Sequence, residues 1–281
     1  MFNRALPSVA ALTTRKGAGV AAAAIVALAA LGTVLSPMRD AAVAQSSAPA
    51  AVDVSKSFSG DQRKAIEQVV REYLLAHPEI LVEVSKELEQ RQQAQLAANQ
   101  QKLIVEKKAS IFRAPTDFVF GNPNGNISVV EFFDYNCGWC KRAVDELVKL
   151  TKTDPNIRVV MKELPIFGEN SAFAAKAAMA SIAQGKYWDF HVALMKERQV
   201  TKDNTLKIAE KVGIDVARLK RDMENPAIEA ALAVNQELAQ GLGIEGTPGF
   251  IVDSRVNVGF LPADGLKQMI AEIRKAGCQV C

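Results

Sequence analysis

The residues with the clearest potential for chemistry are four cysteines, which fall into two pairs of the same spacing. The first pair is Cys137-Gly-Trp-Cys140, and the second, Cys278-Gln-Val-Cys281, closes the chain. The cysteines of a disulfide scaffold are usually spread over distant loops, and this spacing differs from that pattern. Thiol–disulfide exchange needs one sulfur that attacks and another that resolves the mixed disulfide, and a Cys-x-x-Cys pair supplies both.

The first pair lies where a buried strand is expected to meet a helix. The run from Ile127 to Phe133 is apolar except for two residues, which is typical of a central strand. Helical periodicity then follows the cysteines. Cys137 would therefore lie at a helix N-terminus, where unpaired N–H groups and the helix dipole stabilise a thiolate and lower the thiol pKa. We predict that Cys137 attacks and that Cys140 resolves.

A structural disulfide and half of a zinc site are the other uses open to Cys137 and Cys140. A zinc site needs two further ligands, and neither His77 nor His191 has a matching spacing. The tail cysteines could supply them, but only if Cys137 left the helix start. Redox chemistry is therefore the favoured interpretation, and no structural metal is expected. The tail pair fits a passive disulfide, metal binding or exchange with another thiol, and we assign it no role.

Strands and helices follow one another in the order expected of an α/β domain. The expected strands cover 117–120, 127–133, 157–161, 250–252 and 255–260, and the expected helices follow Cys140, fill 170–240 and cover 263–275. The strand–helix–strand unit around Cys140 predicts a parallel pair with a right-handed crossover. We expect Lys162 and Glu163 at a solvated strand end, and Trp188 and Phe190 in the core.

Two amphipathic helices are predicted upstream of this domain. Apolar residues recur every three or four positions over 65–74 and 80–88, and Pro78 separates the two runs. The Gln-rich stretch over 90–101 favours helix but has little to bury, so a solvated rod, a flexible linker or part of an association surface all fit it. Short amphipathic helices must pack on the main domain or on further copies of the chain.

The formal net charge of +3 is carried by the first 44 of the 281 residues, so no basic surface is left for nucleic acid. A basic start, an apolar run over 18–35 and the small residues Ala42-Val43-Ala44 predict a signal peptide, with a retained membrane anchor as the alternative. We predict export to the periplasm. The predicted segments are a signal peptide 1–44, a linker 45–57, an amino-terminal helical oligomerisation segment 58–112, and a redox domain 113–281.

The run from Val130 to Cys140 resembles the active-site segment of DsbA-like proteins, which have a thioredoxin fold with an inserted helical domain. The helices expected over 170–240 match that insertion in place. Gly246-Thr247-Pro248 matches the family's cis-proline loop, which lies beside the redox cysteines and binds the substrate backbone. The resemblance covers about 115–276 and implies an α/β thioredoxin fold.

The same resemblance implies roles for individual residues. Pro248 is expected to be cis, and Thr247 and Pro248, with Gly138 and Trp139, are expected to contact substrate. Glu131 matches the family's buried acid beneath the cysteines, where a carboxyl of raised pKa can accept the proton that Cys140 loses.

Other features of the resemblance bear on redox strength and assembly. Gly138-Trp139 lacks the His that stabilises the thiolate in the strongest oxidants of the family, and Thr247 resembles the isomerases and reductases, so a milder potential is expected. The segment 58–101 resembles the amino-terminal region of the suppressor-of-copper-sensitivity C (ScsC-like) proteins, whose helices can assemble a trimer.

Together these features predict a periplasmic disulfide isomerase or reductase that acts on misfolded or oxidised exported proteins. The expected partners are its protein substrates, a membrane-bound thiol reductase and two further copies of the chain. No cofactor is expected beyond the redox-active disulfide of Cys137 and Cys140. A monomeric DsbA-like dithiol oxidase and a Cu(I)-binding protein that uses the same soft thiolates are the alternatives, and the subfamily raises a link to copper tolerance.

Overall fold

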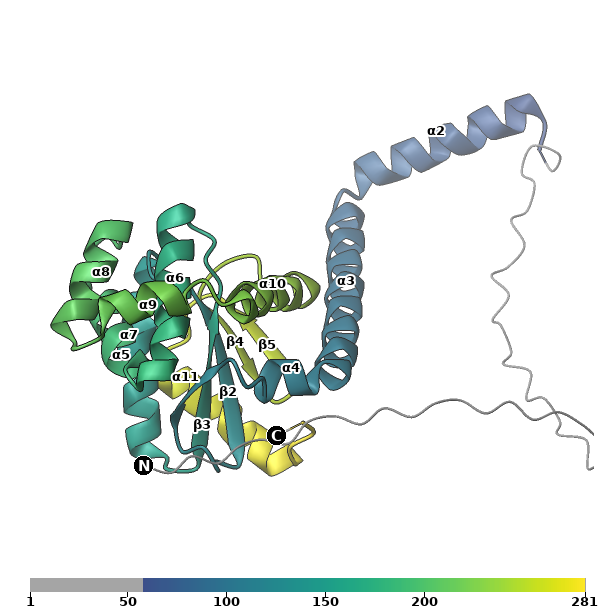
Figure 1. Cartoon of the computed structure of the whole chain (residues 1–281). Coiled ribbons are helices and arrows are strands. Elements are labelled where there is room, and N and C mark those ends of the chain that lie inside the picture. Colours follow the sequence, from purple (N-terminus) through teal and green to yellow (C-terminus); the bar gives the residue numbers. More distant parts are fainter. Residues whose placement is uncertain (1–57, 281) are drawn as a thin grey trace, which may run out of the picture. The chain divides into compact units, whose positions relative to one another are not determined.

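The computed structural model describes residues 58–280 (Figure 1). The chain divides into two compact units, residues 1–65 and 66–281. The predicted signal peptide and linker lie outside the described residues. Between residues 58 and 280, none of the helices has both the length and the apolar character needed to cross a membrane.

One mixed sheet of five strands organises the larger unit. Its spatial order is β1-β3-β2-β4-β5, and only the neighbours β2 and β3 run parallel. The strands are β1 Phe118–Gly121, β2 Ile127–Phe133, β3 Ile157–Glu163, β4 Gly249–Val252 and β5 Arg255–Val258. The predicted parallel pair is thus confirmed, and β2 is the central strand, with all seven of its residues buried.

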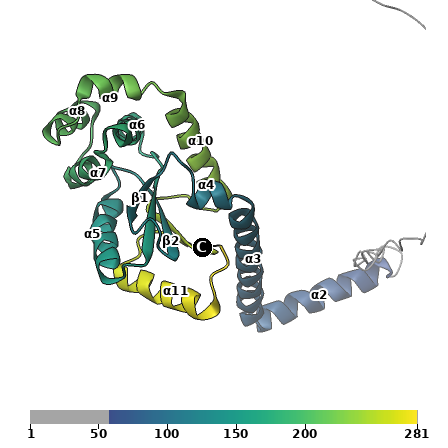
Figure 2. The ribbon, with the colours of Figure 1, turned by 60° about the horizontal axis from the view of Figure 1, so that its bottom comes forward.

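Helices cover both faces of the sheet (Figures 1 and 2). On one face, α5 Gly138–Thr153 and α11 Ala263–Ala276 pack against each other and over the larger core, which takes in Val129 and Phe133. On the other face, α4 Lys108–Phe112 contacts β2 and helps to close a second core that takes in Val130 and Phe132. The alternation of side chains along β2 supplies both cores.

The helical insertion follows β3, as the sequence predicts. It consists of α6 Glu169–Ser181, a short 3₁₀ turn Ile182–Gln184, α7 Tyr187–Lys196, α8 Lys202–Lys211, α9 Val216–Asp222 and α10 Pro226–Gly241. Side-chain caps begin three of these helices, at Thr201, Asp215 and Asn225. Phe190 is fully buried in the larger core and Trp188 packs against it, as expected.

The amino-terminal helices differ in how much they bury. α2 Gly60–Ala76 has no buried residue, and α3 Glu79–Glu106 has only Ile104. The Gln-rich stretch lies inside α3, so it is neither a flexible linker nor a break in the helix. Gln100 Nε2 donates to the carbonyl of Leu242 at 2.7 Å, and Ile104 enters the second core. The packing of the redox domain therefore begins upstream of Pro115, in the last two turns of α3.

Lys162 and Glu163 do not lie at a solvated strand end, so that prediction was wrong. Lys162 is 1% exposed; its Nζ lies 2.6 Å from a carboxylate oxygen of the buried Asp117 and donates to the carbonyl of Ser110 at 2.5 Å. Glu163 is 3% exposed. The reason is topological, because β3 lies between β1 and β2 and helices cover both of its faces.

The tail contacts the turn between β4 and β5. Asp253 Oδ1 accepts the backbone N–H groups of Gln279 and Val280, at 2.8 and 2.7 Å, and Val280 is buried in the second core. Cys278 is disulfide-bonded. A local disulfide, one of the uses left open for the tail pair, would also involve Cys281, which lies outside the described residues.

Replacing Lys162 tests the buried ion pair. Lys162→Met leaves the Asp117 carboxylate buried without its cation, and we expect the free energy of unfolding to fall by about 3 kcal/mol. Urea denaturation measures this change. Lys149→Met, which breaks an exposed pair with Glu146, is the control and is expected to have no measurable effect. Equal stability of the two variants would contradict this account.

Candidate active site

Cys137 is the N-cap of α5, as the sequence predicts. Three residues separate it from the end of β2, and its extended backbone (φ −82°, ψ 117°) turns the chain into the helix. Its sulfur accepts the backbone N–H of Cys140 at 3.4 Å. The thiol form can also donate to the carbonyl of Thr247 at 3.1 Å. A sulfur in this position receives the free N–H groups of the first helical turn.

These contacts make the two cysteines chemically unequal. The hydrogen bond from the Cys140 thiol, with those from the backbone N–H groups of Cys140 and Trp139, lowers the pKa of Cys137 to about 6 against the opposing effect of burial. Burial and the hydrogen bond with Cys137 raise the pKa of Cys140 above its ordinary range. Near neutral pH, Cys137 is therefore a thiolate and Cys140 a thiol.

Glu131 lies on β2 beneath the cysteines and is fully buried. Neither of its carboxyl oxygens has a hydrogen-bond partner among the described residues. Burial raises the pKa of Glu131 well above its usual value, and the Cys137 charge adds to this effect. A surface-facing strand residue is thus excluded, and the carboxyl has the free lone pairs and the basicity that a proton acceptor needs.

The Thr247–Pro248 peptide bond is cis, as the resemblance implied. Pro248 lies immediately before β4, which pairs with β2, so the loop is placed at the same end of the sheet as Cys137. The carbonyl of Pro248 accepts the N–H of Gly259 at 2.9 Å, which fixes the loop against the segment after β5. The Thr247 carbonyl in turn contacts the Cys137 sulfur, so the loop borders the reactive atom.

The surface around Cys137 is open and apolar. Gly138 is exposed, and a side chain at that position would meet no other atom within 4 Å. Trp139 is 53% exposed; its ring centroid lies 5.3 Å from that of Phe260.

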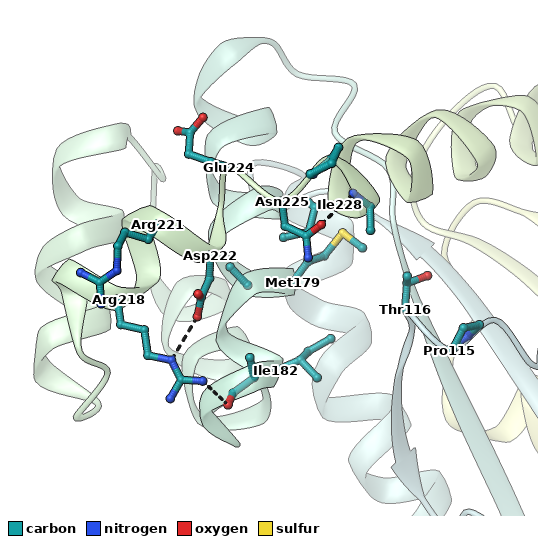
Figure 3. Close-up of a pocket in the computed structure, with 14 residues that line it drawn as sticks. Pro115, Thr116, Met179, Ile182, Arg218, Arg221, Asp222, Glu224, Asn225 and Ile228 are labelled. Carbon is teal, nitrogen blue, oxygen red and sulfur yellow. Dashed lines mark hydrogen bonds and ion pairs between the residues drawn. The ribbon is translucent and has the colours of Figure 1, made fainter. Parts of the chain in front are cut away.

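A pocket of about 580 Å³ is lined by a different set of residues (Figure 3). Residues of α6, α9 and α10 line it, together with Pro115 and Thr116 before β1. Its Arg218 pairs with Asp222 at 3.3 Å and donates to the carbonyl of Ala183. None of the seven predicted site residues lines it.

Sequence reasoning missed the residues that hold the segment ahead of Cys137. One oxygen of the buried Asp134 accepts the N–H groups of Ile166 and Phe167, at 2.8 and 3.0 Å, and the other accepts the Ser171 hydroxyl at 2.7 Å. Asn136 pairs with both backbone groups of Val200, at 2.8 and 3.1 Å. The only signal in the sequence was that polar residues directly follow an apolar strand.

The fold and the cysteine pair define a thiol–disulfide oxidoreductase of the thioredoxin fold. The family model of the DSBA-like thioredoxin domain matches residues 128–271, which is half of the chain. A second family model, that of the copper resistance protein ScsC N-terminal domain, matches residues 62–95. The chain therefore belongs to the DSBA-like thioredoxin family and carries an amino-terminal segment of the ScsC type.

Solved structures agree with this assignment. A thioredoxin-like oxidoreductase from Silicibacter pomeroyi is 46% identical with a TM-score of 0.59, over 60% of this chain and 98% of that one. BcfH from Salmonella enterica Typhimurium is 30% identical with a TM-score of 0.65, over 78% and 98%.

Curated relatives fall into two groups. A probable disulfide bond formation protein D from Bacillus cereus is 25% identical over 189 residues, or 60% of this chain and 85% of that protein. The Na⁺/H⁺ antiporter NhaA 3 of Salinispora tropica is 27% identical over 142 residues, but the chain spans only 22% of its length. The antiporter match therefore concerns one part of a longer protein.

The ionisation of Cys137 can be read from its reactivity. We expect the rate of alkylation of the reduced protein by iodoacetamide to rise with pH through a midpoint at about 6, because only the thiolate reacts. Mass spectrometry of the Cys137 peptide distinguishes this sulfur from the others. Cys140→Ala removes the thiol that donates to Cys137 and is expected to move the midpoint upward. A midpoint above 8 in the unmodified protein would contradict the described geometry.

Proposed function

We propose that this protein is an exported disulfide isomerase or reductase that acts on misfolded or oxidised proteins of the periplasm. The observation that carries the proposal is the Cys137 sulfur of lowered pKa, at a helix N-cap beside the cis Thr247–Pro248 bond. The description of a related solved structure, a periplasmic thioredoxin-like protein from Salmonella enterica serovar Typhimurium, supports the location.

In the proposed reaction the Cys137 thiolate attacks one sulfur of a substrate disulfide. A Cys137–substrate disulfide forms, and the other substrate sulfur leaves as a thiolate. In isomerisation, a different substrate thiolate then attacks the mixed disulfide and restores the Cys137 thiolate with no net change in oxidation. In reduction, Cys140 loses its proton to Glu131 and attacks the Cys137 sulfur, which releases a reduced substrate and leaves the protein oxidised.

The substrate contacts in this proposal follow from the open surface. Thr247 and Pro248 border the reactive sulfur and would pair with an extended substrate backbone, while Gly138 leaves room above Cys137. Trp139 offers an exposed ring to apolar side chains. Unfolded chains expose apolar side chains and backbone together, so this combination favours misfolded proteins over small disulfides.

A moderate redox poise supports isomerase or reductase activity over strong oxidation. The pKa of Cys137 is about 6, between the values of about 7 for thioredoxin and about 3.5 for the strong oxidant DsbA. A less stabilised thiolate makes the disulfide form less oxidising. An isomerase must be kept reduced, so a membrane-bound thiol reductase is the proposed partner; a monomeric dithiol oxidase is the alternative.

Assembly through the amino-terminal helices is the other part of the proposal. Large apolar side chains are exposed along both helices, including Val70 and Tyr73 on α2 and Val84 and Leu88 on α3, each more than 50% exposed. Exposed apolar patches of this extent mark interaction surfaces. We propose that copies of the chain cover them in a homo-oligomer, with a trimer as the expected number.

Copper binding is a second candidate function, favoured by the ScsC-type match over residues 62–95. Cys137 and Cys140 are free thiols at neighbouring positions, and two thiolates suit the soft ion Cu(I). Within residues 58–280 no group of three or more His, Cys, Asp or Glu side chains could hold a metal. In this proposal the two redox thiolates would themselves be the ligands of the copper ion.

The Glu131→Gln variant tests whether Glu131 accepts the proton that Cys140 loses. Glu131→Gln keeps the shape but removes the acceptor for the Cys140 proton, so we expect the mixed disulfide with a model peptide to persist roughly tenfold longer or more. Quenched-flow trapping followed by mass spectrometry measures this lifetime. Alkylation of Cys137 at neutral pH serves as the internal control and is expected to change little. Equal lifetimes in both proteins would rule out the relay.

Recovery of a scrambled multi-disulfide protein tests the isomerase and its assembly together. The protein lacking residues 1–44 is expected to restore activity to scrambled ribonuclease in a weakly reducing buffer, and Cys137→Ser is expected to abolish this. Val70→Glu with Val84→Glu places charge on the apolar helix faces, so sedimentation should show a monomer with most of the isomerase activity lost.

Gln92→Glu with Gln95→Glu adds the same charge to exposed polar positions of α3 and is expected to leave both assembly and recovery unchanged. No recovery by a protein whose Cys137 is alkylated normally would sink the isomerase proposal. In that case a measured redox potential separates an oxidase from a copper-binding protein, and titration with Cu(I) identifies the second.

A further inference from the structure

Glu163 lies in a buried polar cluster beside the active-site segment. It ends β3, where it pairs in register with Phe133, the last residue of β2. One carboxyl oxygen accepts the hydroxyl groups of Tyr135 at 3.0 Å and Tyr187 at 2.8 Å. A carboxyl at this depth is costly unless hydrogen bonds compensate it. The two tyrosines compensate one oxygen, whereas the other oxygen has no hydrogen-bond partner among the described residues.

The cluster joins three separate parts of the chain. Tyr135 stands two residues before Cys137, whereas Tyr187 and His191 belong to α7 of the insertion. The Tyr135 oxygen also lies 3.2 Å from Nδ1 of His191. Burial lowers the pKa of His191 to about 3, so the ring is neutral, and the tautomer with its proton on Nδ1 lets the ring donate to Tyr135 while Tyr135 donates to Glu163.

The backbone around Glu163 is fastened as well. Its carbonyl accepts the side-chain amide of Asn235, on α10, at 3.1 Å, and the next N–H, that of Leu164, donates to the carbonyl of Phe133 at 2.9 Å. The acceptor for Tyr135 therefore has a fixed position relative to the end of β2. Few movements of the segment ahead of Cys137 are possible without breaking a buried hydrogen bond.

We propose that Glu163 is a positioning residue for Cys137, which acts through Tyr135. Holding the Tyr135 hydroxyl sets the exit of the chain from β2, and this exit determines whether the Cys137 sulfur faces the N–H of Cys140 or turns away from it. The hydrogen bonds that stabilise the thiolate thus depend on a carboxyl that touches neither cysteine. The inference rests on the oxidoreductase chemistry of Cys137 and not on isomerase activity.

The experiment measures the alkylation rate of Cys137, and its equilibrium with glutathione, in the full, reduced chain that carries Glu163→Leu. Loss of the acceptor loosens Tyr135 and weakens the hydrogen bonds to the thiolate, so its pKa rises. A rise of about one unit from about 6 lowers the rate of alkylation at pH 6 about fivefold. The equilibrium with glutathione shifts toward the oxidised protein, because the reduced form has lost its stabilised thiolate.

Two comparison variants separate positioning from simple loss of stability. Glu163→Gln keeps an oxygen that can accept both tyrosine hydroxyls, and it is expected to restore the alkylation rate and the glutathione equilibrium. Phe190→Leu disturbs the same helix and core without a polar contact to Tyr135. It is expected to lower the Tm while leaving both readouts unchanged.

Tyr135→Phe removes only the hydroxyl, so it tests the proposal even if the Glu163→Leu variant does not fold. It is expected to slow alkylation in the same direction. The proposal is overturned if Tyr135→Phe, or a folded Glu163→Leu, alkylates and equilibrates like the unmodified protein, or if Phe190→Leu shifts both readouts as strongly.

Discussion

The reactivity of Cys137 depends on a buried strand that ends against the start of a helix. β2 is central and fully buried, and it leads the chain into the first turn of α5, whose free N–H groups have the Cys137 sulfur as their acceptor. Burial raises the pKa of Cys137, Cys140 and Glu131 alike, and only at Cys137 do hydrogen bonds to the sulfur outweigh this effect. One environment thus ionises one sulfur and keeps the other protonated above a carboxyl.

This arrangement requires the short segment between strand and helix to hold its shape. Asp134, Tyr135 and Asn136 each send a side chain into a buried or half-buried hydrogen bond with another part of the chain. Their partners lie at the end of β3, in the loop after it and in the insertion. The inserted helices are therefore part of the active-site framework, because they supply the hydrogen-bond partners that a bare thioredoxin sheet would lack.

Much of the fold followed from the sequence because strand and helix periods are local signals. The strand 127–133 was placed at its observed bounds, and the insertion agreed within one or two residues. The polar residues were harder. Lys162 and Glu163 were expected to be solvated because charged groups usually are, and their buried partners Asp117, Tyr135 and Tyr187 lie 24 to 45 positions away. Such pairings depend on topology, which local patterns do not contain.

The cis-proline shows a different limit. The tripeptide Thr247-Pro248-Gly249 on its own favours a trans turn, and only the resemblance to a known family implied the cis bond that the structure has. The cysteines needed no such help, since their spacing and place before a helix already predicted a reactive pair. The reactive cysteine pair could thus be predicted from the local sequence. The position of the Thr247 loop, which is 110 positions from Cys137 in the sequence, could not.

The raised pKa of Cys140 also bears on the choice between isomerisation and reduction in the proposed mechanism. Once Cys137 has formed a mixed disulfide, Cys140 must lose a proton before it can attack, and burial makes that loss costly. A substrate thiol near its ordinary pKa of about 8.5 is ionised more readily. A second substrate thiol can therefore attack the mixed disulfide before Cys140 does. In the proposed mechanism, Glu131 sets the lifetime of the mixed disulfide, because it accepts the proton of Cys140. A buried resolving cysteine above a weakly acidic carboxyl favours isomerisation for the same reason that it slows reduction.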